Sequence, residues 1–224
     1  QDIIVGSPSY YTWIEADGGY SDTGGAGGDG GTVTLDSKGG AVSVRGGLEA
    51  YGGEAYEGQG GKGGAITVTA ATGIGIEYIE ADGGDAEASY TDTASIAASF
   101  TEAEDWTAGA GGTIKLSSAG PVAVDYVSAY GGHSHTGSGG KGGSVEITSA
   151  QDVSIGTFEG EGYGYIGVYG GTGGQSPLAA GGGGGAASAS PTVAGVGTPA
   201  LSLGVDDRWT IDPTLRHPVT VEVA

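Results

Sequence analysis

The feature of this sequence that most restricts its fold is a set of three short segments that recur in the same order along the chain. The first reads TVTLDS, AITVTA, TIKLSS and SVEITS, starting at Thr32, Ala65, Thr113 and Ser144, always after a Gly-Gly pair. The second reads AVSV, GIGI, PVAV and DVSI, and the third reads IEADGG, LEAYGG, IEADGG, VSAYGG and IGVYGG. Each segment alternates apolar and polar residues between glycines, which predicts short strands with one buried face.

Aligning the copies places aliphatic side chains at six inward positions. The columns are Val33/Ile66/Ile114/Val145, Leu35/Val68/Leu116/Ile147, Val42/Ile74/Val122/Val153, Val44/Ile76/Val124/Ile155, Ile14/Leu48/Ile79/Val127/Ile166 and Ala16/Ala50/Ala81/Ala129/Val168. In the middle copies the second and third segments follow each other too closely for a helical crossover. The pattern therefore predicts an all-β fold, a parallel β-helix or solenoid of about five coils, right-handed by default.

The connections between the third segment and the next copy of the first are rich in Gly-Gly-X triplets. They read GGAGGDGGT from Gly24, GGKGGA from Gly60, GGKGGS from Gly139 and GGTGGQ from Gly170. A period of three matches an extended helix of the polyproline II type, whose backbone groups can bond sideways. We expect polyglycine-II-like returns that hydrogen-bond to one another; the alternative is a flexible glycine-rich loop.

The repeats divide the chain into three parts. Residues 13–192 are the predicted solenoid, with one insertion at 85–107, between an N-terminal segment, 1–12, and a C-terminal segment, 193–224. Each outer segment contains a candidate strand that either caps the solenoid or adds to the sheet of another molecule. The candidate self-assembly residues are Ile3, Ile4, Val5, Val219, Val221 and Val223.

Charge and composition exclude several classes of protein. The chain has 27 acidic and 7 basic residues, a net charge of -20, which disfavours nucleic-acid binding. No apolar run is long enough for a membrane-spanning helix, so membrane insertion is not expected. Without cysteine there is no disulfide framework. A start at Gln1 and the absence of Met favour a secreted protein whose signal peptide has been removed, located outside the cell or on its surface.

The sequence contains no recognisable catalytic motif, and its three histidines form no metal-ligand pattern. We therefore expect no enzyme and no organic cofactor. The third segments stack carboxylates on their outward side, which is unfavourable unless a cation bridges them or water screens them. The candidate calcium ligands are Glu15, Asp17, Glu49, Glu80 and Asp82; solvated carboxylates are the alternative.

Aromatic residues mark two candidate contact surfaces. Trp13, Tyr78, Tyr126 and Tyr165 occupy the outward position before each third segment, a row interrupted by Gly47. The insertion adds Tyr90, Phe100 and Trp106. Such rings can stack on sugars, which predicts a polysaccharide or a cell-surface receptor as a partner. Ring packing that only stabilises the fold is the alternative.

The pattern GG-TVTL-x-S-x-GG-AVSV, followed by a short third strand and Gly-Gly, resembles the repeats of filamentous-haemagglutinin-like and autotransporter-like bacterial surface proteins. The resemblance covers residues 13 to about 175 and implies export and a surface role. We therefore expect a structural subunit of an extracellular filament or surface fibre, which polymerises with itself by end-to-end stacking or strand addition. The alternative is a carbohydrate- or receptor-binding adhesin module.

Overall fold

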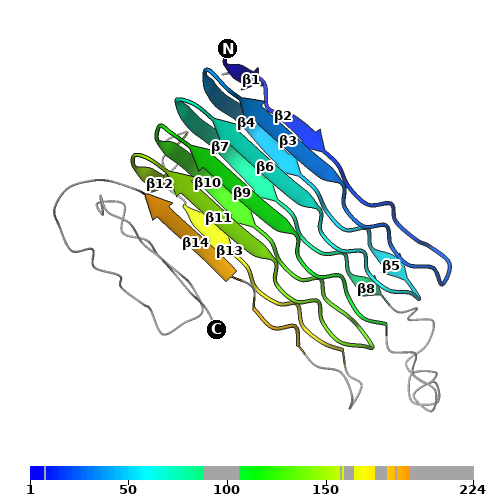
Figure 1. Cartoon of the computed structure of the whole chain (residues 1–224). Coiled ribbons are helices and arrows are strands. Elements are labelled where there is room, and N and C mark those ends of the chain that lie inside the picture. The colour runs from blue at the N-terminus through cyan, green and yellow to red at the C-terminus, as the bar shows by residue number, and fades with distance from the viewer. Residues whose placement is uncertain are drawn as a thin grey trace, which may run out of the picture.

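The computed structural model describes residues 1–7, 9–87, 106–156, 158, 164–174 and 181–184, and the backbone of 186–191. All regular elements in these ranges are strands, and all pairs between named strands are parallel, so the described chain is all-β. Because these ranges contain no helix, they contain none that could cross a membrane. The strands lie side by side in the order of the repeats (Figure 1).

One sheet is built from the first segments. It consists of β3 (Thr32–Ser37), β6 (Ala65–Ala70), β9 (Thr113–Ser118), β11 (Ser144–Ser149) and β14 (Ala186–Pro191). These strands pair in this order, and the registers align Val33 with Ile66, Ile114 and Val145, as predicted. The structure adds β14 as a fifth copy, which pairs in register with β11. Its sequence AASASP contains no large aliphatic residue, so the apolar pattern did not reveal it.

The other large sheet is built from the second and third segments. It consists of β1 (Ile3–Val5), β2 (Thr12–Glu15), β4 (Ala41–Glu49), β7 (Gly73–Glu80), β10 (Val122–Ser128), β12 (Val153–Ile155) and β13 (Tyr165–Gly167). Second and third segments run together in β4, β7 and β10, whereas β1 with β2, and β12 with β13, supply them as separate strands. The four predicted columns of these segments follow the observed pairing.

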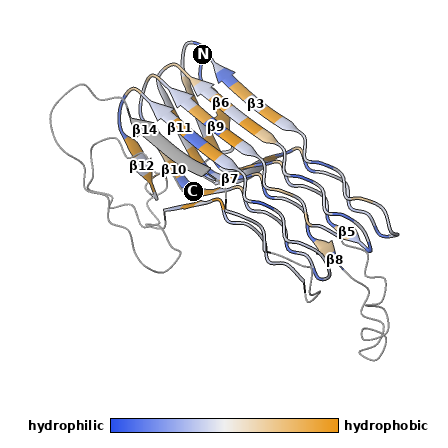
Figure 2. Ribbon diagram, turned by 60° about the horizontal axis from the view of Figure 1, so that its bottom comes forward, coloured by the Kyte–Doolittle hydropathy of each residue, from blue (hydrophilic) through white to orange (hydrophobic). Residues whose placement is uncertain are grey.

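The aliphatic columns of both sheets form one hydrophobic cluster between the sheets. Ile66, Val68, Ile76 and Ile79 in the middle strands are fully buried. Bands of hydrophobic residues continue across neighbouring strands in Figure 2. Most members at the ends of the columns are only partly buried: Ile3, Val5, Ile14, Ala16 and Leu35 at one end, and Val153, Ile155 and Ile166 at the other. Val33 and Val168, also at column ends, are buried.

The glycine tracts are ordered by hydrogen bonds to one another. A continuous series of backbone bonds alternates between tracts leaving the third segments and tracts returning to the first. It runs from Gly28 to Gly19, Gly53 to Gly28, Gly61 to Gly53, Gly84 to Gly61, Gly109 to Gly84, Gly132 to Gly109, Gly140 to Gly132, Gly171 to Gly140 and Gly182 to Gly171, donor first, at 2.7–2.9 Å. Beyond the tracts, β5 (Ala55–Tyr56) pairs with β8 (Ala86–Glu87). A flexible loop therefore does not describe these returns.

Close approach explains why the tracts consist of glycine. A Cβ atom added at Gly53 would lie 2.1 Å from the carbonyl oxygen of Gly19, and one added at Gly61 would lie 2.0 Å from that of Gly28. No side chain fits at such distances, since the obstacle is backbone. The X residues of the triplets point outward, and Lys62 and Lys141 are exposed.

Candidate functional surface

The outward side of the third segments collects most of the predicted site residues in three neighbouring columns. Parallel pairing places Trp13, Gly47, Tyr78, Tyr126 and Tyr165 at equivalent positions. Two residues on, the next outward column contains Glu15, Glu49, Glu80, Ser128 and Gly167. The third contains Asp17, Tyr51, Asp82, Tyr130 and Tyr169. The surface is therefore acidic near β2 and aromatic near β13.

Six rings on this surface form one connected series, which we call the aromatic ladder. Ring centroids are separated by 5.7 Å between Trp13 and Tyr78, 6.1 Å between Tyr78 and Tyr126, and 5.1 Å between Tyr126 and Tyr165. The ladder continues over 6.3 Å from Tyr165 to Tyr130 and over 5.7 Å from Tyr130 to Tyr169. It extends across the sheet from β2 to the segment that follows β13.

Two glycines make room for these ring contacts. A Cβ atom at Gly47 would lie 1.9 Å from Cζ3 of Trp13, so the indole ring lies over Gly47 and reaches Tyr78 two strands away. A Cβ atom at Gly167 would lie 2.5 Å from the hydroxyl of Tyr130, which donates a hydrogen bond to the hydroxyl of Tyr165. The interruption that Gly47 makes in the sequence row is thus bridged by the largest ring.

Ring orientation bears on the predicted sugar contact. Three pairs are stacked with interplanar angles of 29°, 18° and 13°. Sugar stacking uses an open ring face. In these pairs the facing sides are covered by the neighbouring ring. Trp13, 41% exposed at the end of the ladder, offers the most accessible ring of the six.

The glutamate column carries perturbed carboxyl groups. Partial burial raises the pKa of Glu49 to about 7, with further contributions from the charges of Glu80, Asp17 and Glu15. The hydroxyl of Tyr51 donates to Glu80 at 2.5 Å, and burial together with this bond raises the pKa of Tyr51. The pKa of Glu49 therefore lies near neutrality, first because the carboxyl group is partly buried and second because its in-register neighbours are also acidic.

The two aspartates predicted as calcium ligands bind protein groups. Asp17 accepts the backbone N–H of Tyr51 at 2.8 Å. Asp82 accepts the N–H of Tyr130 at 2.7 Å and the hydroxyl of Ser128 at 2.9 Å. Burial raises the pKa of Asp82 to about 6, although both bonds oppose the shift. In the described ranges, no three or more histidine, aspartate or glutamate residues gather in a group that could hold a metal ion. Calcium binding stays a prediction.

The bonds of Asp17 and Asp82 belong to a wider pattern that sequence reasoning missed. Asp29 likewise accepts the N–H of Lys62 at 2.8 Å, and Asp85 accepts that of His133 at 2.6 Å. In each case the donor stands at the equivalent position of the next repeat. Aligning the glycine tracts would have placed each aspartate one repeat before its donor. From the sequence, these carboxylates were considered only as calcium ligands or solvated charges, and backbone N–H groups were not considered as their partners.

The remaining predicted residues are distributed as follows. Ile3, Ile4 and Val5 form β1 and pair with Val42, Ser43 and Val44 of the same chain. The carbonyl of Trp106 accepts the hydroxyl of Ser134 at 2.6 Å, which attaches the end of the insertion to a later repeat. Tyr90, Phe100, Val219, Val221 and Val223 lie outside the described residues.

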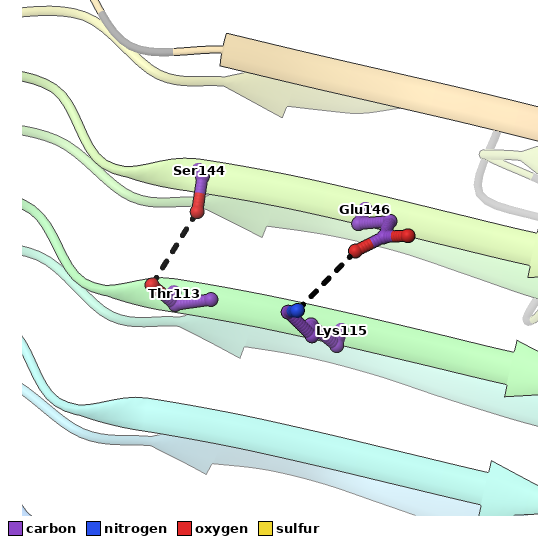
Figure 3. Close-up of polar contacts among 4 residues, drawn as sticks. All are labelled: Thr113, Lys115, Ser144 and Glu146. Atoms are coloured by element: carbon purple, nitrogen blue, oxygen red, sulfur yellow. Dashed lines mark hydrogen bonds and ion pairs between the residues drawn. The ribbon is translucent and has the colours of Figure 1, made fainter.

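The opposite sheet presents polar side chains and ion pairs on its outward side. Nζ of Lys115 lies 3.5 Å from a carboxylate oxygen of Glu146 in the same column, and Ser144 and Thr113 hydroxyls are 3.3 Å apart (Figure 3). Both ion-paired side chains are more than half exposed, so the pair contributes little stability. These contacts link β9 to β11 without forming a site.

No protein-family model matches this chain, and no curated protein and no solved structure is significantly similar to it.

Proposed function

We propose that this chain is a parallel β-solenoid, right-handed by default, with polyglycine-II-like returns, and that it is a structural subunit of an extracellular filament or surface fibre. The support comes from repetition: both sheets and the glycine tracts bond each repeat to the next in the same register. Such a stack is quasi-one-dimensional and can be extended by adding equivalent units. The described residues contribute structure, and the proposal assigns them no catalytic role.

The observation that carries the proposal is the open end of the stack formed by β1, β2 and β3. Within the described residues, the outer edges of these strands pair with no further strand of either sheet. Ile3, Ile14 and Leu35 at the column ends keep partial exposure, while their middle-strand equivalents are buried. An exposed parallel edge beside open apolar columns favours the addition of another strand layer. A second copy would supply this layer in a head-to-tail, fibre-forming contact.

Blocking this edge tests the proposal. Ala65 donates to the carbonyl of Gly31, and because successive N–H groups of a strand alternate in direction, the N–H of Thr34 faces away from β6. Thr34→Pro removes that donor and leaves the β3–β6 bonds in place. Thr34→Val keeps the donor and is the matched control.

Negative-stain electron microscopy of the purified protein is the measurement, made with and without a chelator. We expect fibres from the parent and Thr34→Val, and isolated particles from Thr34→Pro with an unchanged melting temperature. Isolated particles from the parent, with or without calcium, would refute self-assembly. They would favour the second candidate, a polysaccharide- or receptor-binding adhesin module, which the accessible Trp13 ring supports.

A further inference from the structure

The aromatic ladder has a property that a purely structural row of rings does not need. All six members are tyrosine or tryptophan, the aromatic side chains that lose one electron far more readily than phenylalanine does. Phenylalanine would stack equally well, but the chain has only 2 Phe against 12 Tyr and 3 Trp. The ladder contains no phenylalanine.

The chain also lacks the usual targets of oxidation. It contains neither Cys nor Met, the two side chains that normally take up oxidising equivalents first. Tyrosine and tryptophan rings are therefore the most readily oxidised side chains that the chain contains. These rings are in contact over the entire ladder, with successive centroids 5.1–6.3 Å apart.

At two positions the ring-to-ring contact could be interrupted, and at both the structure maintains it. Gly47 leaves β4 without a ring in this column, but the indole of Trp13 lies over Gly47 and contacts Tyr78 on β7. The step from Tyr165 to Tyr130 is the longest and most tilted, at 6.3 Å and 57°, and here a hydroxyl–hydroxyl hydrogen bond connects the two residues. Gly167 leaves the space for that bond.

We propose that the aromatic ladder is a redox relay that conducts one-electron oxidising equivalents along the stack to the exposed Trp13. The substrate is a one-electron oxidant that meets the protein near Tyr169. The oxidant gains one electron from this tyrosine, whose phenolic proton leaves. An electron from each next ring then fills the vacancy, and each tyrosine regains a proton as it is reduced. In the net reaction, one electron passes from Trp13 through the ladder to the oxidant, which is reduced, and the indole N–H proton of Trp13 is released to solvent.

A tethered photo-oxidant can test this transfer, because a chain without cysteine allows labelling at one introduced thiol. Thr172→Cys places the thiol at an exposed position three residues after Tyr169. A ruthenium–polypyridyl label, oxidised by a flash and an external quencher, then serves as the oxidant. Transient absorption reports the indolyl radical, and Trp13→Phe in the labelled protein defines the background.

The decisive variant is Tyr126→Phe, which keeps a ring in the stack but removes an oxidisable one. We expect the indolyl signal to fall to the background, with the melting temperature and circular dichroism unchanged. Tyr78→Phe should do the same at a more exposed position. Tyr56→Phe, in the separate two-stranded sheet, is the control and should leave the signal intact.

Two results would overturn the relay. One is an indolyl signal in the labelled parent no larger than in Trp13→Phe. The other is an undiminished signal in Tyr126→Phe and Tyr78→Phe, which would show that transfer bypasses the ladder. Neither result depends on fibre formation, so the relay and the proposed function succeed or fail independently.

Discussion

Single residues show most clearly how repetition changes ordinary chemistry. A glutamate on a surface strand is normally a solvated anion, but in this stack Glu49 lies in register between Glu15 and Glu80. Repetition of a favourable core residue thus also repeats its outward neighbours, including acidic ones. Like charges directly opposite on paired strands are destabilising.

The raised carboxyl pKa values predict a protein that is more stable in mild acid. Glu49 has a pKa of about 7 in the folded protein against 4.5 ordinarily, and Asp82 has about 6 against 3.8. Between these values the folded state binds more protons than the unfolded state, so the free energy of unfolding falls as pH rises from about 4 to 7. Thermal unfolding followed by circular dichroism should give a higher melting temperature at pH 5 than at pH 8.

Glu49→Gln should remove part of this pH dependence. The neutral amide does not repel Glu15 and Glu80, so we expect a higher melting temperature than the parent at pH 8 and little difference at pH 5. Glu146→Gln is the control on the opposite sheet, where the carboxylate is paired with Lys115. An equal response of both variants to pH would contradict the assignment to the glutamate column.

Gly47 offers a second prediction at the scale of one residue. Gly47→Ala places a methyl group where the indole of Trp13 now lies and should separate it from Tyr78. The loss of one stacked pair corresponds to about 1 kcal/mol of unfolding free energy. Urea unfolding measures the change, and Ser43→Ala, at another position of the same strand and away from the ladder, is the control. An unchanged tryptophan emission spectrum would indicate that the ring had not moved.

At the scale of elements, the strands with large aliphatic residues could be predicted from the sequence, because period-two alternation between glycines has few alternatives. The pairing of these strands followed from the spacing of the copies. β14 could not be predicted, since AASASP contains no large aliphatic residue and its register comes from pairing with β11. For β1 the sequence left a cap and a strand donated to another molecule as alternatives, and the structure pairs it with β4 of its own chain, where Ile3 and Val5 extend two columns.

The outward surface of the third segments could be predicted only in part. The row of Trp13, Tyr78, Tyr126 and Tyr165 followed from counting residues, as did a second row of Tyr51, Tyr130 and Tyr169 at the equivalent position of three repeats. The contact that joins the two rows, between Tyr165 and Tyr130, depends on side-chain directions and on the space left by Gly167. The aspartate bonds to the next repeat were missed for the same reason. Sequence spacing gives the position of a side chain along the strand but not the backbone group it will meet.

The glycine tracts yield a prediction at this scale. Gly61→Ala forces a methyl group against the carbonyl of Gly28, and because the obstacle is backbone, we expect a loss of about 1–3 kcal/mol in unfolding free energy. Lys62→Ala changes the adjacent, outward position and should stay within about 0.5 kcal/mol of the parent. Chemical denaturation of both variants decides the matter; equal stabilities would mean that the tracts are not tightly packed.

At the scale of the whole molecule, the register makes one repeat the unit of length. Deleting residues 113–143 removes β9, β10 and their return, and joins Gly112 to Ser144 in the place of Thr113. Since Thr113 and Ser144 are in register, β11 should pair with β6. We expect a folded protein with one cooperative transition and a stack shorter by about 4.8 Å.

A deletion that removes part of a repeat is the contrasting case. Loss of residues 113–128 takes out β9 and β10 but leaves their glycine return, so the following strands can no longer meet equivalent partners. Circular dichroism and solubility should show a poorly folded product. If both deletions fold equally well, the repeats are not interchangeable units.

The direction of the hydrogen bonds between repeats determines how a stack of these repeats would respond to tension. The bonds between strands in both sheets, and every second bond of the glycine series, join one repeat to the next and therefore lie along the stacking direction. A force applied along that direction would act at the same time on all the hydrogen bonds between two neighbouring repeats, in both sheets and in the glycine tracts. Separating the two repeats would require these bonds to break together. Force applied to one chain end would instead peel bonds in succession, so toughness would depend on where the load is attached.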